Sequence, residues 1–264
     1  MNTRMFKMLA TTVLVTLPLA GCATGDTTEV EGGAKIVEEG KLTVCTHLPY
    51  KPFEFNQGGE VVGFDIDLMD LVADELGLET KVFDTPFEGI QSGQSLNTGQ
   101  CDVAAAGMTI TDERAEVIDF SDPYFDATQA LLTKTGSGIT SMEDLAGKSL
   151  AVQVGTTGEI YAEENAPEDT TLRSFEDLAL LAAAVKTGQV DAAINDNGVL
   201  YDYVKSNPDT EVVTEFDTGE QYGFAVKKDD NEALLETINE VLATAKEDGT
   251  YDKIYAKWFG EAKS

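Results

Sequence analysis

The chain has few basic residues, a single histidine and no apolar run long enough to cross a membrane. Its 18 lysines and arginines stand against 48 aspartates and glutamates, which gives a formal net charge of −30 at pH 7. This acidity excludes nucleic acid as a partner, because binding to the phosphate backbone requires basic side chains. It indicates a strongly solvated surface instead. The uncharged run at residues 8–20 has thirteen residues, whereas a membrane-spanning helix needs about 20.

Motifs for catalysis and for metal binding are also missing. Neither His47 nor the cysteines have the spacing of metal ligands. No Gly-x-Ser-x-Gly segment is present to form the nucleophile turn of a serine hydrolase. Residues 147–149, Gly-Lys-Ser, resemble the end of a phosphate-binding loop, but Met142 stands where that motif requires glycine. We therefore expect no metal, no cofactor and no catalytic activity.

The N-terminus has the pattern of a secretory signal peptide. Arg4 and Lys7 precede the uncharged run at residues 8–20, which is typical of such signals. The run ends in Leu-Ala-Gly-Cys at residues 19–22, which is similar to the bacterial lipobox. We predict that the mature chain begins at Cys22 with a lipid on its sulfur, which anchors it to the extracytoplasmic face of the cell membrane. The alternative is an ordinary secretory signal with a chance cysteine.

The predicted organisation is a signal peptide at residues 1–21, a flexible tether at 22–35 and a folded part beyond it. The tether is rich in Gly, Thr and Glu and has almost nothing to bury. Loss of the signal removes two basic residues and no acidic one, so the mature net charge is 16 − 48, or −32. The folded part has about 225 residues, enough for one large domain or two modest lobes.

Strand-like and helix-like stretches alternate along the folded part, which predicts α/β lobes with mostly parallel sheets. The predicted strands are residues 41–46, 81–83, 101–106, 149–154 and 190–194. The predicted helices are residues 65–76, 86–98, 158–164, 174–187 and 231–259, the last with a break at Gly249. Ser174 and Asp177 resemble a capping box at the start of their helix.

Two segments 89 residues apart nearly coincide, residues 98–104 (Thr-Gly-Gln-Cys-Asp-Val-Ala) and 187–193 (Thr-Gly-Gln-Val-Asp-Ala-Ala). They are either an internal repeat or one helix-turn-strand solution reached twice, and both explanations indicate two similar lobes. A cleft between lobes is a preferred place for a ligand. Cys45 and Cys101 lie in or beside predicted strands, and the sequence leaves open whether they form a disulfide or remain two buried thiols.

Polar residues follow the predicted strands of the first lobe. Thr109 and Arg114 come after the strand at 101–106, at the edge where open α/β sheets bind ligands. The planar guanidinium of arginine matches a carboxylate. The alternative for Arg114 is a surface salt bridge with Glu113 or Glu116.

The second lobe offers a complementary pair of segments. Residues 155–158, Gly-Thr-Thr-Gly, lie between a strand and a helix, where hydroxyls and free N–H groups suit an anion. Asp196 lies at the end of the next strand and is suited to hold an ammonium group. The alternatives are a plain helix cap and a turn. A carboxylate site and an ammonium site together point to an α-amino acid.

These segments resemble the polar amino-acid binding proteins of ABC importers. The similarity lies in the order and spacing of residues 63–68 (Gly-Phe-Asp-Ile-Asp-Leu), 108–124 and 155–158, and it extends over roughly residues 41–260. It implies an α/β fold of the two-lobed periplasmic-binding-protein type (type II), with two hinge strands and a ligand cleft between the lobes. Lobe one would comprise residues 36–127 and 226–264, and lobe two residues 128–225.

The resemblance also implies seven ligand-binding residues: Tyr50, Phe87, Gly107, Thr109, Arg114, Thr157 and Asp196. Arg114 would pair with the ligand carboxylate, helped by Thr109 and by the backbone of Thr157. Asp196 and the carbonyl of Gly107 would take the ammonium. Tyr50 and Phe87 would be aromatic walls around the ligand side chain, with simple core packing as their alternative.

The chain departs from the family pattern in ways that affect specificity. His47 replaces an acid found in relatives that bind basic amino acids, which argues against lysine or arginine as the ligand. Gly107 and Gly158 replace polar residues, so the side-chain preference stays open.

The implied function is the capture of a free, polar amino acid by lobe closure. A monomeric, lipid-anchored protein would deliver it to the permease subunits of an ABC importer. The rival is a secreted dehydratase on the same fold, with His47 or Glu54 as its general acid. No base or orienting partner for either is recognisable in the sequence.

Overall fold

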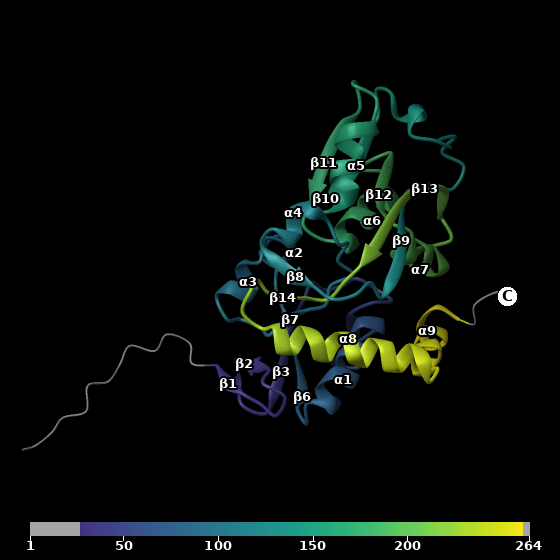
Figure 1. Cartoon of the computed structure of the whole chain (residues 1–264). Helices are drawn as coiled ribbons and strands as arrows, with labels where there is room; N and C mark the ends of the chain where they lie inside the picture. The colour runs from purple at the N-terminus through teal and green to yellow at the C-terminus, as the bar shows by residue number, and fades with distance from the viewer. Residues whose placement is uncertain (1–26, 261–264) are drawn as a thin grey trace, which may run out of the picture.

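Two five-stranded sheets form the centre of the molecule, one in each of two α/β lobes (Figure 1). The structure is a computed structural model that describes residues 27–260. The predicted signal peptide, Cys22 and residues 23–26 of the predicted tether therefore lie outside the described residues. The rest of the tether is ordered, because residues 28–29 pair with residues 35–36 and Ala34 is fully buried. The two-lobed α/β architecture of type II is confirmed.

The sheet of the first lobe has the strand order β6-β3-β7-β14-β8. Its strands are β3 (Lys41–Thr46), β6 (Glu79–Asp84), β7 (Val103–Ala104), β8 (Ile118–Phe120) and β14 (Ala225–Lys227). β3 runs parallel to β6 and β7, whereas β14 runs antiparallel to β7 and β8. Leu42, Val44 and Cys45 are fully buried, because helices cover both faces of the sheet around β3.

Helices and two short hairpins complete the first lobe. The helices are α1 (Phe64–Glu75), α2 (Phe87–Gln91), α3 (Gln94–Asn97), α4 (Asp112–Ala115), α8 (Glu232–Glu247) and α9 (Thr250–Phe259). The hairpins pair β1 (Thr28–Glu29) with β2 (Lys35–Ile36) and β4 (Phe55–Gln57) with β5 (Glu60–Val62). The single helix predicted at residues 86–98 is divided into α2 and α3, because Gly93 adopts a left-handed φ of 73°. The predicted tail helix and its break at Gly249 are confirmed.

The sheet of the second lobe has the strand order β11-β10-β12-β9-β13. Its strands are β9 (Phe125–Lys134), β10 (Ser149–Gln153), β11 (Thr171–Phe175), β12 (Ala192–Asp196) and β13 (Thr210–Tyr222). The helical elements are the 3₁₀ turn η1 (Glu143–Leu145), α5 (Thr157–Asn165), α6 (Leu178–Thr187) and α7 (Asn197–Ser206). β10 is parallel to β11 and β12, and β9 is antiparallel to both of its neighbours.

The predicted start of the helix at 174–187 is wrong. Ser174 lies in β11, where it pairs with Val152 of β10, and the helix begins only at Leu178. Asp177 caps it alone, because its carboxylate accepts a hydrogen bond from the backbone N–H of Leu180 at 2.8 Å. Residues 174–175, which the capping pattern assigned to the helix, belong instead to a strand, because they pair with β10.

The chain passes between the lobes twice, from β8 to β9 and back from β13 to β14. β9 and β13 pair antiparallel, with register shifts at residues 212–214 and 216–220. The lobe limits at residues 127 and 225 stay a prediction. Both copies of the repeated segment begin at the end of a helix and continue through a glycine turn into a strand, with left-handed φ angles at Gly99 and Gly188.

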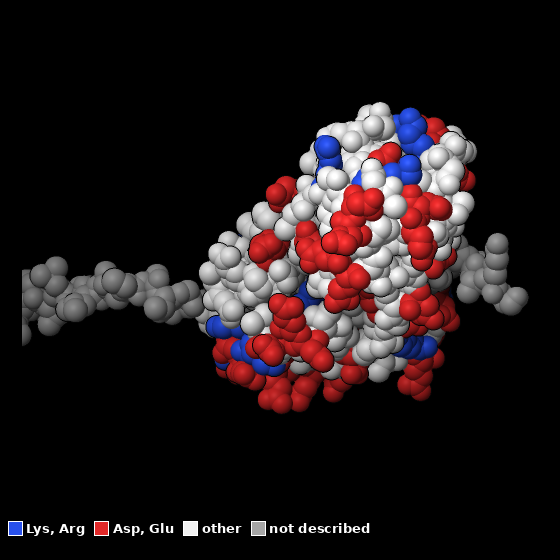
Figure 2. Space-filling model, turned by 90° about the horizontal axis from the view of Figure 1, so that it is seen from above, with Lys and Arg blue, Asp and Glu red and all other residues white. Residues whose placement is uncertain are grey.

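Cys45 and Cys101 form a disulfide with Cα atoms 5.6 Å apart. This decides the alternative that the sequence left open, and it ties β3 to the turn before β7. Acidic side chains spread over the visible face of both lobes, with few basic ones between them (Figure 2). Among the helices of residues 27–260, none combines the length and the apolar character that a membrane crossing requires.

Candidate functional site

A narrow cavity, partly open to solvent, lies between the two lobes at the ends of β3, β7, β10 and β12. It is lined by His47, Tyr50, Phe87, Ala106, Gly107, Thr109, Arg114, Gln153, Thr156, Thr157 and Asp196. All seven predicted ligand-binding residues are in this lining. Their contacts with a ligand remain predictions, but the structure brings them together around one space.

Arg114 is the cation of the cavity. It lies in α4, which begins after Thr111, whose hydroxyl accepts a hydrogen bond from the Arg114 backbone N–H at 3.2 Å. Its guanidinium donates to the carbonyl oxygens of Thr109 at 2.7 Å and of Gly155 at 3.0 Å, so it bridges the two lobes. The guanidinium carbon also lies 5.3 Å from the centre of the Phe87 ring, a cation–π arrangement.

Arg114 is only 5% exposed. Burial lowers the pKa of Arg114, while the negative charges of Asp196 and Glu220 act in the opposite direction. The alternative of a surface salt bridge to Glu113 or Glu116 finds no support, since none of the ion pairs within residues 27–260 involves Arg114. Its charge is therefore available to an anion in the cavity.

Asp196 is the anion of the second lobe, at the end of β12 and directly before α7. It is 6% exposed, and its side chain does not cap α7. Its carboxylate accepts hydrogen bonds from the Tyr50 hydroxyl at 2.7 Å, from the Gln129 amide at 2.5 Å and from the Tyr222 hydroxyl. Burial, and then the charge of Glu220, raise the pKa of Asp196 to about 6, against the effect of these hydrogen bonds.

The Gly-Thr-Thr-Gly segment contains both of the features proposed for it, on different residues. Thr156 caps α5, because its hydroxyl accepts from the backbone N–H of Glu159 at 3.2 Å. Thr157 lies in the first turn of α5, where backbone N–H groups lack partners within the helix. Its hydroxyl donates to Glu220 at 2.8 Å. The cap and the candidate anion site are thus neighbours.

Tyr50 and Phe87 form walls of the cavity and are each 8% exposed. Gly107 has a left-handed φ of 51°, and a Cβ atom there would lie 2.7 Å from the Tyr50 ring. Glycine is therefore required at this position for the ring to lie beside the backbone. Both aromatic residues also belong to hydrophobic clusters. Each ring therefore packs in the core on one side and lines the cavity on the other.

Two buried carboxylates lie beneath the Gly107 turn. Asp65 accepts from the Gly107 backbone N–H at 3.0 Å and from the Tyr124 hydroxyl at 2.8 Å, and burial raises its pKa to about 7. Glu54 is fully buried, and within residues 27–260 neither of its carboxylate oxygens has a hydrogen-bond partner. Burial, and then the charge of Asp65, raise the pKa of Glu54 well above its usual range.

The sequence analysis missed Glu220, Gln129 and Tyr222. Glu220 accepts from the hydroxyls of Thr109 at 2.7 Å and Thr157 at 2.8 Å, and the Gln129 amide donates to it at 3.1 Å. These residues come from β9 and β13, the two strands next to the crossings between the lobes. One glutamate in so acidic a chain has no sequence signal that distinguishes it.

The family model for bacterial extracellular solute-binding proteins, family 3, matches residues 42–261 of the chain. The chain belongs to this family. A curated relative, the glutamine-binding protein of an ABC transporter from Bacillus subtilis, is 43% identical over 209 residues, which cover 77% of this chain and 74% of the relative. The resemblance inferred from the sequence motifs is therefore confirmed.

Solved structures of similar proteins agree with this family assignment. An ancestral arginine-binding protein bound to glutamine is 44% identical, with a TM-score of 0.79, and the match covers 85% of this chain and 100% of that one. An ancestral amino-acid-binding protein that was a precursor of cyclohexadienyl dehydratase is 42% identical, with a TM-score of 0.75 and coverage of 83% and 95%. The dehydratase alternative thus has a structural neighbour, but that neighbour is itself a binding protein.

The two candidate general acids of the dehydratase alternative differ in position. The His47 ring lies in the cavity wall, with its two nitrogens 3.0 Å from the carbonyl oxygens of Thr85 and Glu176. Glu54 is fully buried and is not part of the lining. Only His47 therefore has the access to the cavity that a general acid requires.

Proposed function

We propose that this family 3 protein captures one free amino acid between its lobes and delivers it to the permease subunits of an ABC importer. The observation that supports this most directly is the pair Arg114 and Asp196, opposite charges that are both buried at one small cavity. A zwitterion is the ligand that satisfies both without adding net charge. Desolvated charges of this kind require partners.

The ligand carboxylate would bind the Arg114 guanidinium, the Thr109 hydroxyl and the backbone N–H of Thr157. The ammonium would bind the Asp196 carboxylate and the carbonyl oxygen of Gly107. The Tyr50 and Tyr222 hydroxyls also donate to Asp196. These hydrogen bonds hold the carboxylate in position and offset part of the cost of its burial.

The ligand side chain would lie between Tyr50 and Phe87. Relatives of this protein are described as binding glutamine or arginine, and His47 replaces the acid expected in binders of basic amino acids. Its ring is held by backbone carbonyls on both sides. We infer a polar amino acid and expect glutamine to bind more tightly than arginine.

Closure of the lobes would follow from contacts shared between them. Arg114 donates to Gly155 across the cleft, and Tyr50 donates to Asp196. A ligand held by both lobes stabilises the closed state alone and shifts the population toward it. We place the hinges at the two crossings, which divides the chain into residues 36–127 with 226–264 and residues 128–225.

The same proposal includes the location of the protein. We infer that it is a monomer on the extracytoplasmic face of the membrane, held by a lipid on Cys22. Its tether would give the lobes freedom to reach the permease.

A thermal-shift screen of the chain without its signal against the common amino acids tests the function. The cognate amino acid should raise the melting temperature, because a thousandfold excess over the dissociation constant stabilises the folded state by about 4 kcal/mol. Chromatography of the same samples should recover the amino acid unchanged. If the amino acid is consumed, the dehydratase alternative is correct instead.

A further inference from the structure

Glu220 lies at the place proposed for the carboxylate of the ligand. Its Oε2 atom accepts from the Thr109 hydroxyl of the first lobe at 2.7 Å and from the Thr157 hydroxyl of the second lobe at 2.8 Å. The Thr109 hydroxyl is a group assigned above to the α-carboxylate, and the Thr157 hydroxyl belongs to a residue whose backbone N–H was assigned to it. The structure therefore contains a carboxylate of its own at the edge of the carboxylate subsite, without an ion pair to Arg114.

The charges around Glu220 fit the same interpretation. The negative charge of Glu220 acts to raise the pKa of Arg114, as a nearby anion should. Gln129 lies between the two acids of the cavity, because its amide nitrogen donates to Asp196 at 2.5 Å and to Glu220 at 3.1 Å. One hydrogen-bonded network in the second lobe thus connects Asp196, Gln129 and Glu220.

Glu220 and a bound ligand cannot use the Thr109 hydroxyl together, since a threonine hydroxyl has one proton to donate. Two carboxylates at hydrogen-bond distance from the same hydroxyl also repel each other. Glu220 has room to move, because it is half-buried and follows the exposed Gly219 at a register shift of β13. Ligand binding therefore requires its carboxylate to leave the subsite.

We propose that Glu220 is an internal substitute for the ligand carboxylate, which holds the empty lobes together and is displaced when an amino acid binds. This inference rests on the proposed function and identifies a residue that sets its affinity. Glu220 lowers the affinity for every amino acid, because each ligand must first displace it from the Thr109 hydroxyl. It also raises the closed population of the empty protein.

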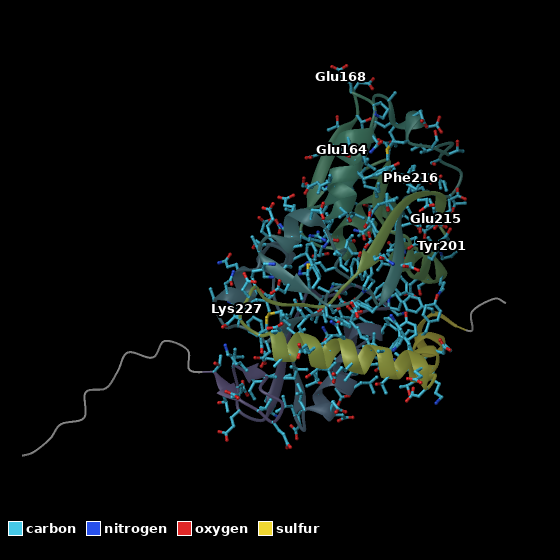
Figure 3. All side chains as sticks on the ribbon, in the orientation of Figure 1. Glu164, Glu168, Tyr201, Glu215, Phe216 and Lys227 are labelled. Atoms are coloured by element: carbon cyan, nitrogen blue, oxygen red, sulfur yellow. A yellow bond between two sulfur atoms is a disulfide. The ribbon has the colours of Figure 1, made fainter. Side chains whose placement is uncertain are left out.

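The test uses Glu220→Ala and the isosteric Glu220→Gln, with Glu215→Ala as the matched control. Glu215 lies on the same strand, but its carboxylate accepts from Thr128, Asn197 and Tyr201. Figure 3 shows Glu215 and Tyr201 together beside β13. Calorimetric titration with L-glutamine and L-arginine should show about tenfold tighter binding to Glu220→Ala, about 1.4 kcal/mol. Glu220→Gln should be intermediate and Glu215→Ala unchanged.

Two measurements on the empty protein complete the test. Small-angle scattering should give a larger radius of gyration for Glu220→Ala than for the wild type, and a larger decrease when L-glutamine is added. Sodium acetate should raise the melting temperature of Glu220→Ala more than that of the wild type, with sodium chloride as the salt control, because acetate restores the missing carboxylate.

Unchanged or weaker binding by Glu220→Ala, with a wild-type protein that binds normally, would overturn the inference and leave the proposed function standing. Weaker binding would mean that Glu220 contacts the ligand itself. A wild type that binds no amino acid would defeat the proposed function and the subsite assignment with it. Circular dichroism of each variant confirms that a change in affinity is not a loss of folding.

Discussion

Lowering the pH from 7.5 to 5 should weaken amino-acid binding and at the same time stabilise the empty protein. The pKa of Asp196 in the folded protein is about 6, raised from 3.8 chiefly by burial. The proposed ammonium contact requires the ionised carboxylate. At pH 5, one unit below this pKa, about one tenth of the protein has Asp196 ionised, so the affinity should fall about tenfold.

The effect on stability has the opposite sign. Between its unfolded and its folded pKa, an acid whose folded pKa is raised binds a proton in the folded state but not in the unfolded state. The free energy of unfolding therefore falls as pH rises through this range. For Asp196 the window extends from about pH 4 to about pH 6. The whole window corresponds to about 3 kcal/mol, and the step from pH 7.5 to pH 5 regains about half of it, about 1.4 kcal/mol. Asp65 and Asp102, with pKa values raised to about 7 and about 6, act in the same direction.

Calorimetric titration with L-glutamine at pH 7.5 and pH 5, together with thermal unfolding of the empty protein at both values, measures the two effects. Asp196→Asn is the control, because it should remove the pH dependence of binding and reduce that of stability. An affinity unchanged at pH 5 would refute the assignment of the ammonium to Asp196. An empty protein less stable at pH 5 than at pH 7.5 would refute the argument from burial.

Three further predictions concern the disulfide, the Gly107 turn and the anchor. The Cys45→Ser, Cys101→Ser double variant should lose about 4 kcal/mol of unfolding free energy in urea titrations, because the disulfide closes a loop with a sequence separation of 56. A loss below about 1 kcal/mol would contradict this. Gly107→Ala should bind amino acids at least about tenfold more weakly in calorimetry, because its Cβ would lie 2.7 Å from the Tyr50 ring. Wild-type affinity would show that the backbone at this position shifts to accept a Cβ, and would contradict the prediction. Cys22→Ser should no longer partition into detergent in a phase-separation assay of expressing cells, and unchanged partitioning would refute lipidation.

Most of the parallel strands were predictable because their apolar residues are consecutive and their ends are marked by glycine or polar residues. The predictions at residues 41–46 and 149–154 match strands at 41–46 and 149–153, whereas the parallel strand β11 was missed. β13 was not, because its sequence, Thr-Glu-Val-Val-Thr-Glu-Phe-Asp-Thr-Gly-Glu-Gln-Tyr, is mostly polar and half-exposed. Its strand conformation depends on pairing with β9, a contact between distant parts of the chain.

The charged ends of the site were predictable and its network was not. Arg114 follows a strand within a motif and Asp196 lies at the end of a strand, so position and residue type together indicated a role. Glu220 and Gln129 have the residue types of a solvated surface, and only the crossing of the chain between the lobes brings them to the cavity. The error at Ser174 has the same origin, since a local capping pattern was outweighed by sheet pairing.

Calorimetric titration of Arg114→Ala and Asp196→Ala with the amino acid found in the screen tests the central claim most directly. Arg173→Ala is the control, because Arg173 is exposed on β11. Removal of one partner of a desolvated charge pair costs about 2–5 kcal/mol, which corresponds to a loss of affinity of roughly 30- to 4,000-fold. The account predicts such a loss in both variants, with folding intact and the control unchanged. Near-wild-type affinity in either variant would contradict it.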